Sequence, residues 1–179
     1  MLLFIVPAIL LIGFGSAQTI NDCPVGVPRD TYLKVHGGFC FDFFVPSPVD
    51  YNTANAECNK HGGTLPIVTS KDISDFLIDQ LVYEYGAGSR IWIGLNDKAT
   101  EGTYVWEDGT PLSSSYSNWD PSRNSTSANH DCVNFDPTKN GVWNEDYCED
   151  TFFGLFEHER PYVCQYKARA GSVTTTHSA

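Results

Sequence analysis

Apolar residues recur at helical spacing in the segment that follows Ser47. Tyr51, Ala54 and Cys58 would share one face of a helix. Serine is a favourable N-cap and proline suits the first helical position, so Ser47-Pro48-Val49-Asp50 predicts a helix that begins after Ser47. The Gly62-Gly63 pair is expected to end it.

A second amphipathic segment follows Ser70, which is again a suitable N-cap. Gly86 is the expected end of this second helix. Its apolar side consists of Ile73, Phe76, Leu77 and Leu81.

From Arg90 onward the pattern changes to short apolar or aromatic runs between turn residues, which is typical of β-strands. Two helices followed by several short strands indicate an α+β domain. Residues 111–129, rich in Ser and Asn, are expected to form a long loop, and loops of that length are usually functional or disordered. The expected strands are residues 91–95, 103–106, 132–135, 142–143 and 162–166.

The two ends of the chain differ from the middle. Residues 2–14 are almost wholly apolar and precede Gly15-Ser16-Ala17, small residues of the kind that a signal peptidase recognises. About 13 apolar residues are too few to span a bilayer, which needs about 20. We therefore expect a signal peptide at residues 1–17, one domain at 18–167, and a disordered Ser/Thr-rich tail at 168–179. The protein should be secreted and extracellular, without membrane insertion.

The net charge of the chain limits the classes of molecule that it can bind. The chain has 22 acidic and 11 basic residues, a net charge of -11. Such a surface repels phosphate backbones and anionic headgroups, which argues against nucleic acid and membrane binding. Hydrophobic residues make up 41% of the chain, enough for a core.

All six cysteines follow the expected signal peptide. An even number in an oxidising compartment suggests three disulfides, for which about 15 pairings exist. The cysteines are Cys23, Cys40, Cys58, Cys132, Cys148 and Cys164.

An ordered series of motifs between residues 23 and 167 resembles the C-type lectin-like domain family. Each motif alone is weak, but their order is specific. The motifs are Gly38-Phe39-Cys40-Phe41, Ala56-Glu57-Cys58, Gly62-Gly63-Thr64-Leu65, Trp92-Ile93-Gly94-Leu95-Asn96-Asp97, Glu101-Gly102, Trp106-Glu107-Asp108-Gly109, Asp131-Cys132-Val133, Trp143-Asn144 and Tyr162-Val163-Cys164.

The resemblance implies two helices packed on short antiparallel sheets, with a long ligand-side loop region and stabilising disulfides. It also implies the pairs Cys58–Cys164 and Cys132–Cys148, and Cys23–Cys40 as the N-terminal hairpin of the family's long form. Four tryptophans sit at positions that the family uses mostly for its core: Trp92, Trp106, Trp119 and Trp143.

Sugar-binding members of the family hold calcium with a Glu-Pro-Asn or Gln-Pro-Asp triplet, an acid before Asp-Cys, and Trp-Asn-Asp. Calcium takes about six to eight oxygen ligands, and sugar hydroxyls fill the vacant positions. Here Arg123-Asn124-Ser125 stands at the triplet, or Asn124 on its Asn after a one-residue shift, and His130 replaces the acid. Asn124, Asn144 and Glu145 are the remaining candidate ligand residues, so the resemblance predicts a degraded calcium-bridged sugar site.

The family's auxiliary calcium site is better matched, with Asp97, Glu101 and Asp131 at its positions. A fourth carboxylate is missing, so calcium as a cofactor is left open. Asn124-Ser125-Thr126 is also an N-glycosylation sequon, and we expect a glycan on Asn124.

The five histidines show no metal-ligand spacing, and the sequence contains neither a nucleophile elbow nor a phosphate loop, so an enzyme is not expected. The leading hypothesis is a secreted recognition module that binds a glycan or glycoprotein through the long-loop face. The alternative is a calcium-independent protein-binding module or an acidic matrix or mineral-associated protein.

Overall fold

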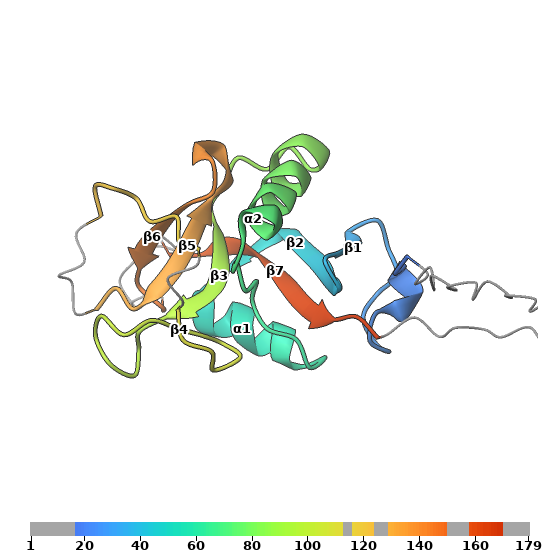
Figure 1. The fold of residues 1–179 in the computed structure, drawn as a ribbon, viewed down its shortest axis with the longest axis horizontal. Helices are drawn as coiled ribbons and strands as arrows, with labels where there is room; N and C mark the ends of the chain where they lie inside the picture. Colours follow the sequence, from blue (N-terminus) through green and yellow to red (C-terminus); the bar gives the residue numbers. More distant parts are fainter. Residues whose placement is uncertain (1–16, 113–115, 124–128, 150–157, 170–179) are drawn as a thin grey trace, which may run out of the picture.

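The computed structural model describes residues 17–112, 116–123, 129–149 and 158–169, which form two antiparallel sheets and two α-helices (Figure 1). One sheet has the order β1-β2-β7 and the other the order β4-β3-β5-β6. The expected α+β class is therefore confirmed. In chain order, the elements are η1 (Ile20–Asp22), β1 (Leu33–His36), β2 (Phe39–Val49), α1 (Tyr51–Asn59), α2 (Lys71–Ile78), η2 (Asp79–Glu84), β3 (Ile91–Asn96), β4 (Val105–Trp106), β5 (Cys132–Asp136), η3 (Pro137–Lys139), β6 (Val142–Asp146) and β7 (Arg160–Lys167).

Helix α1 begins later than the sequence suggests. Its N-cap is Asp50, whose carboxylate accepts the Thr53 N–H at 2.7 Å, and the expected N-cap Ser47 lies in β2 instead. Val49 pairs with Arg160 on β7, which holds the preceding residues extended beyond a register shift. The prolines in this stretch are tolerated because the strand is irregular there. The apolar face of α1 is as expected, since Tyr51, Ala54 and Cys58 are all buried.

Helix α2 matches the expectation at both ends. The Ser70 hydroxyl accepts the Ile73 N–H, and the chain continues through the π-helical turn η2 to Gly86, which has a positive φ of 63°. Leu77 and Leu81 are fully buried on its apolar side. Figure 1 shows α2 and α1 on opposite sides of the central strands.

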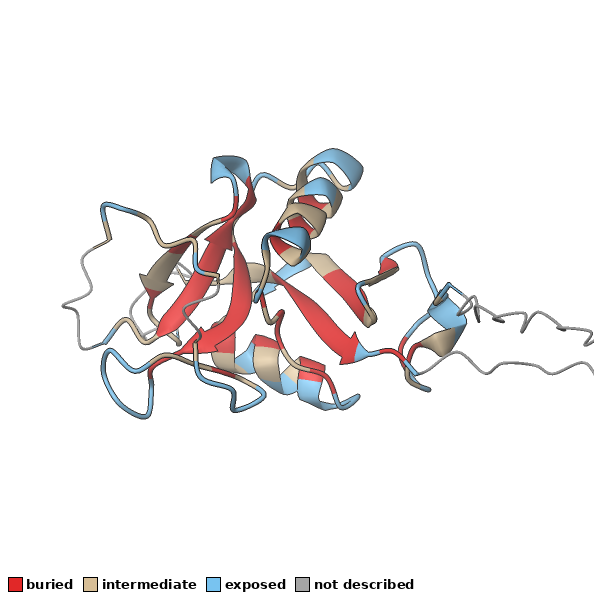
Figure 2. Ribbon diagram, in the orientation of Figure 1, coloured by how far each residue is buried: buried red, intermediate tan, exposed pale blue. Residues whose placement is uncertain are grey.

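Strand β2 separates two apolar clusters because alternate residues of a strand point to opposite faces. Cys40 and Phe44 belong to one cluster, while Phe41 and Phe43 belong to the other. The red segments of Figure 2 run along the inner strands of both sheets.

The tryptophans divide as the resemblance implied. Trp92, Trp106 and Trp143 are buried, and Trp119 is only partly buried. The two indoles of Trp106 and Trp143 meet edge to face, with ring centroids 5.8 Å apart. Most of these rings are therefore core residues and are not exposed for stacking on a ligand.

Three disulfides cross-link the domain, and they are the pairs that the resemblance implied. Cys58–Cys164 joins α1 to β7, Cys132–Cys148 closes the segment around β6, and Cys23–Cys40 ties the N-terminal segment to β2.

The boundary of the C-terminal tail needs a correction. Ala168 is buried and its N–H donates to the Gly38 carbonyl, and the Arg169 N–H donates to the Asp22 carbonyl at 2.8 Å. These two residues therefore belong to the folded body. The rest of the expected tail and residues 1–16 of the expected signal peptide lie outside the described residues. Within the described ranges, no helix is long and apolar enough to cross a membrane.

Candidate functional site

The candidate ligand residues lie at the end of the four-stranded sheet where β3 finishes and β5 begins. Because these strands are antiparallel neighbours, Asp97 after β3 and Asp131 before β5 come together there. The Asp97 N–H donates to the Asp131 carbonyl at 3.1 Å. Strand β6 pairs with β5 and brings Glu145 to the same region.

An arginine of the long loop forms an ion pair with the carboxylate of Glu145. Arg123 Nη1 lies 3.0 Å from Glu145 Oε1, and the hydroxyl of Tyr104 donates to the same oxygen. The Glu145 side chain is only 6% exposed. The guanidinium also lies 3.9 Å from the ring centroid of Trp119, at cation–π distance. A cation supplied by the chain itself therefore neutralises this buried carboxylate.

Local backbone contacts explain why Arg123 points back over the sheet. Asn118 accepts the Trp143 N–H and Asp120 donates to the Trp143 carbonyl, so this part of the loop runs beside β6. The Asp120 carboxylate then accepts the N–H and hydroxyl of Ser122, which forms a turn and lowers the pKa of Asp120. This turn places the guanidinium of Arg123 over the ring of Trp119.

Tyr104 is the third member of this arrangement. Burial raises the pKa of Tyr104, and its hydrogen bond to Glu145 raises that pKa further. The phenol therefore remains a hydrogen-bond donor to Glu145 over the physiological pH range.

Of the other two expected ligand residues, only Asn144 lies within the described part of the chain. Asn144 lies beside Glu145 on β6, and its Nδ2 is buried without a hydrogen-bond partner among the described residues. Asn124 and its sequon lie outside the described residues. The ring of His130, at the position of the family's acid, packs edge-on against Tyr147 with centroids 4.3 Å apart.

The auxiliary acids form a loose group. Asp97 is 2% exposed; its Oδ2 accepts the Gly102 N–H at 2.7 Å, while its Oδ1 is buried without a partner among the described residues. Partial desolvation raises the pKa of Glu101, and the carboxylates of Asp97, Asp131 and Glu145 raise it further. These acids are therefore close enough to repel one another.

The donor atoms in this region match the needs of calcium only in part. The orphaned Asp97 oxygen suits a cation, but the described residues contain no group of three or more acidic, histidine or cysteine side chains arranged to hold a metal ion. At Glu145, Arg123 already supplies the positive charge. The residues at Glu145 therefore do not fit calcium.

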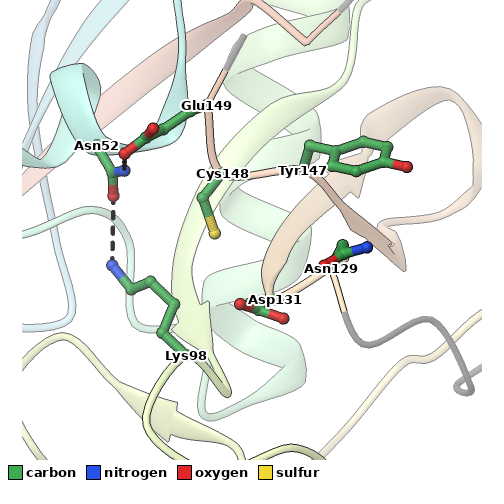
Figure 3. Close-up of a pocket in the computed structure, with 7 residues that line it drawn as sticks. All are labelled: Asn52, Lys98, Asn129, Asp131, Tyr147, Cys148 and Glu149. Atoms are coloured by element: carbon green, nitrogen blue, oxygen red, sulfur yellow. Dashed lines mark hydrogen bonds between the residues drawn. The ribbon is translucent and has the colours of Figure 1, made fainter. Parts of the chain in front are cut away.

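A hollow of about 590 Å³ opens beside these acids (Figure 3). This volume lies within the range of about 300–1,000 Å³ that is usual for ligand sites. Figure 3 shows Lys98, Asn52 and Glu149 on one side of the hollow and Tyr147 on the other. The lining residues are Asn52, Lys98, Asn129, Asp131, Tyr147, Cys148 and Glu149.

One wall of the hollow is held by a short polar network. Lys98 Nζ lies 3.4 Å from Asn52 Oδ1, and Asn52 Nδ2 donates to Glu149 Oε1 at 2.7 Å. Of the lining side chains, sequence motifs indicated only Asp131 as a candidate ligand residue and Cys148 as a disulfide partner. The others come from α1, the turn after β3, the loop before β5 and the segment after β6, and no local pattern links them.

Comparison with known proteins agrees with this architecture. Residues 47–166 match the family model described as "Lectin C-type domain". A tetranectin-like protein of Carcharhinus perezii is 33% identical over 116 residues, which cover 65% of this chain and 64% of that protein. The chain thus spans somewhat less than two thirds of that relative.

Solved structures show the same fold. The C-type lectin CEL-I from Cucumaria echinata superposes with a TM-score of 0.64 at 22% identity, covering 76% of this chain and 95% of that one. A calcium-independent type II antifreeze protein superposes with a TM-score of 0.63 at 21% identity, covering 78% of this chain and 94% of that one.

Proposed function

Because the chain belongs to the C-type lectin domain family, we propose that it is a secreted recognition protein that binds a glycan or glycoprotein without a calcium bridge at Glu145. The family consists generally of binding domains and not of enzymes. The observation that carries the proposal is the contact of 3.0 Å between Arg123 and Glu145.

Electrostatics explain why this contact matters. A calcium ion at Glu145 would have to displace both the guanidinium and the Tyr104 hydroxyl, or bind beside a positive charge. At about 4 Å, two unit charges near a protein surface interact by about 4 kcal/mol, which corresponds to roughly a thousandfold change in affinity. Asn144 cannot offset such a loss, because it is a single neutral ligand.

The hollow beside Asp131 supplies an alternative binding surface. Sugar hydroxyls both donate and accept hydrogen bonds, and the hollow offers donors in Lys98 and Asn129 and acceptors in Asp131 and Glu149. A neutral glycan also meets no repulsion from the net charge of -11, unlike a phosphorylated or sulfated ligand.

A glycan array probed with and without chelator tests the proposal. We expect binding that persists in chelator and that is weakened by Asn129→Ala. Asn59→Ala, at an exposed position on α1, is the matched control and should leave binding unchanged. A mannose or galactose column that retains the protein in calcium and releases it with chelator would contradict the proposal.

A second candidate function is favoured by the charge. The net charge of -11, the exposed Glu101 and the partly exposed Asp131 also suit a calcium-independent protein ligand or an acidic matrix or mineral-associated protein. Binding to a basic protein partner or to calcium phosphate, together with an array on which no glycan is retained, would favour this function over the first.

A further inference from the structure

A second cavity lies away from the long loops, between the segment before β1 and the middle of β2. Its volume is about 150 Å³, close to the size of a small organic molecule. Two carboxylates and several apolar rings line it: Asp30, Asp42, Tyr32, Phe44, Pro28 and Pro46.

Asp42 is the unusual member of this lining. Asp42 is only 3% exposed. Among the described residues, no hydrogen bond or ion pair reaches its carboxylate. Its backbone is held between Leu33 on β1 and Cys164 on β7, which fixes the face of the sheet from which the side chain projects. A buried carboxylate without a partner is unfavourable, and a cation in the cavity would compensate it.

Asp30 adds a second negative charge on the same cavity. Its Oδ1 accepts the Tyr32 N–H at 2.9 Å, which holds the side chain in the turn before β1. Burial raises the pKa of Asp42 to about 6; repulsion from Asp30 adds to this, and the His61 ring acts in the opposite direction. At neutral pH Asp42 is therefore mostly ionised, and the cavity presents negative charge.

The other residues that line the cavity determine which class of cation it favours. A hard metal ion takes about six to eight oxygen ligands, whereas this cavity offers two carboxylates and one serine among rings. Aromatic faces attract organic ammonium groups. The rings are held in place, because Phe44 stacks on Tyr162 with centroids 4.7 Å apart and Tyr32 lies 5.2 Å from Tyr85.

We propose that this cavity binds the ammonium head group of a small organic cation, with Asp42 as the counter-ion, Asp30 as the outer carboxylate, and Tyr32 and Phe44 as the walls. The proposal does not depend on how the protein recognises glycans.

Calorimetric titration of the purified protein tests the proposal. The probes are choline and tetramethylammonium for a quaternary group, methylammonium for a primary one, and 3,3-dimethylbutanol as the uncharged analogue of choline. We expect at least one of the three ammonium compounds to bind, whether quaternary or primary. The uncharged alcohol should bind at least about tenfold more weakly than that compound. Equal binding of choline and the alcohol, or no ammonium binding up to about 10 mM, would overturn the proposal.

Matched variants locate the site. Asp42→Asn keeps the shape of the side chain and removes its charge, so it should weaken binding by about tenfold or more while leaving the fold intact. Asp79→Asn changes an exposed acid on η2 and should have no effect. Unchanged affinity in Asp42→Asn, with a normal thermal unfolding transition, would refute the assignment.

The pH dependence provides a second readout. A bound cation favours ionised Asp42, so affinity should rise by about tenfold between pH 5 and pH 7. The His61 ring also interacts with Asp42, and His61→Gln removes that interaction, so this variant should retain most of the rise if Asp42 is responsible for it. A flat profile in His61→Gln would overturn the role of Asp42. The titratable groups coupled to Asp42 are Asp30, His61, Tyr85, Tyr162 and Tyr166.

Discussion

Arg123 and Glu145 form an ion pair of 3.0 Å between two positions at which the family resemblance predicted calcium ligands. The pair joins residues 22 positions apart, one on the long loop and one on β6. It is enclosed by Trp119 and Tyr104, so water screens it less than an exposed ion pair.

The first prediction concerns calcium. Calorimetry on the purified domain should detect no millimolar or tighter calcium site that disappears in the double variant Asn144→Ala with Glu145→Ala, because Arg123 compensates Glu145 already. Any weaker site should instead be lost in Asp97→Asn, which removes the negative charge of the carboxylate whose Oδ1 has no partner among the described residues. Loss of tight binding in the double variant alone would contradict this.

The second prediction concerns stability at the ion pair. Arg123→Ala leaves a buried carboxylate without its counter-charge and should lower the free energy of unfolding by about 2–4 kcal/mol in urea denaturation. Lys71→Ala, which breaks an exposed pair with Asp75, should leave the free energy of unfolding nearly unchanged. Combining Arg123→Ala with Glu145→Gln should recover part of the loss, and no recovery would mean that packing on Trp119 dominates.

The third prediction concerns Asp42. Its pKa is raised in the folded state to about 6 from an ordinary 3.8, so the folded protein binds the proton more tightly than the unfolded chain. The stability that this provides is complete below about pH 4 and is lost as pH rises through 6. Asp42→Asn should therefore be more stable than the parent at pH 7, by up to about 3 kcal/mol, with the difference vanishing near pH 4. Thermal unfolding at both pH values checks this, and the opposite trend would disprove it.

The fourth prediction ranks two disulfides by how much each stabilises the folded protein. Cys58–Cys164 spans 106 positions and Cys23–Cys40 only 17. In the chain-entropy model, their removal costs about 4.7 and about 3 kcal/mol, respectively. The Cys58→Ala, Cys164→Ala pair of changes should therefore unfold at lower denaturant than the Cys23→Ala, Cys40→Ala pair. The reverse order would show that strain or residual structure outweighs loop entropy.

The fifth prediction is a glycan on Asn124. The sequon Asn124-Ser125-Thr126 and the expected export support it. The intact mass of protein from its native host should fall after amidase treatment, and Asn124→Gln should abolish the change. An unaltered mass in the parent protein would rule it out.

Much of the framework can be read from short-range patterns. The buried faces of α1 and α2, the Ser70 cap and the strands from β3 to β7 follow from residue spacing and turn residues, because these depend on neighbours within a few positions. The start of α1 was the exception. Val49 is held extended by Arg160, which lies more than a hundred positions away, and this pairing overrides the local preference for a helix after Ser47.

The sites required the tertiary structure. The family resemblance predicted that Arg123 and His130 stand at or beside the positions of carboxyl ligands, but only the fold decided that Arg123 turns onto Trp119 and pairs with Glu145. The hollow beside Asp131 depends on contacts such as that between Asn52 and Glu149, 97 positions apart. Asp42 appears in the sequence as one acid in an apolar strand, and its low exposure arises only because two sheet neighbours and the residues around the cavity cover it. Burial and charge pairing depend on which distant segments meet, and no local pattern encodes that.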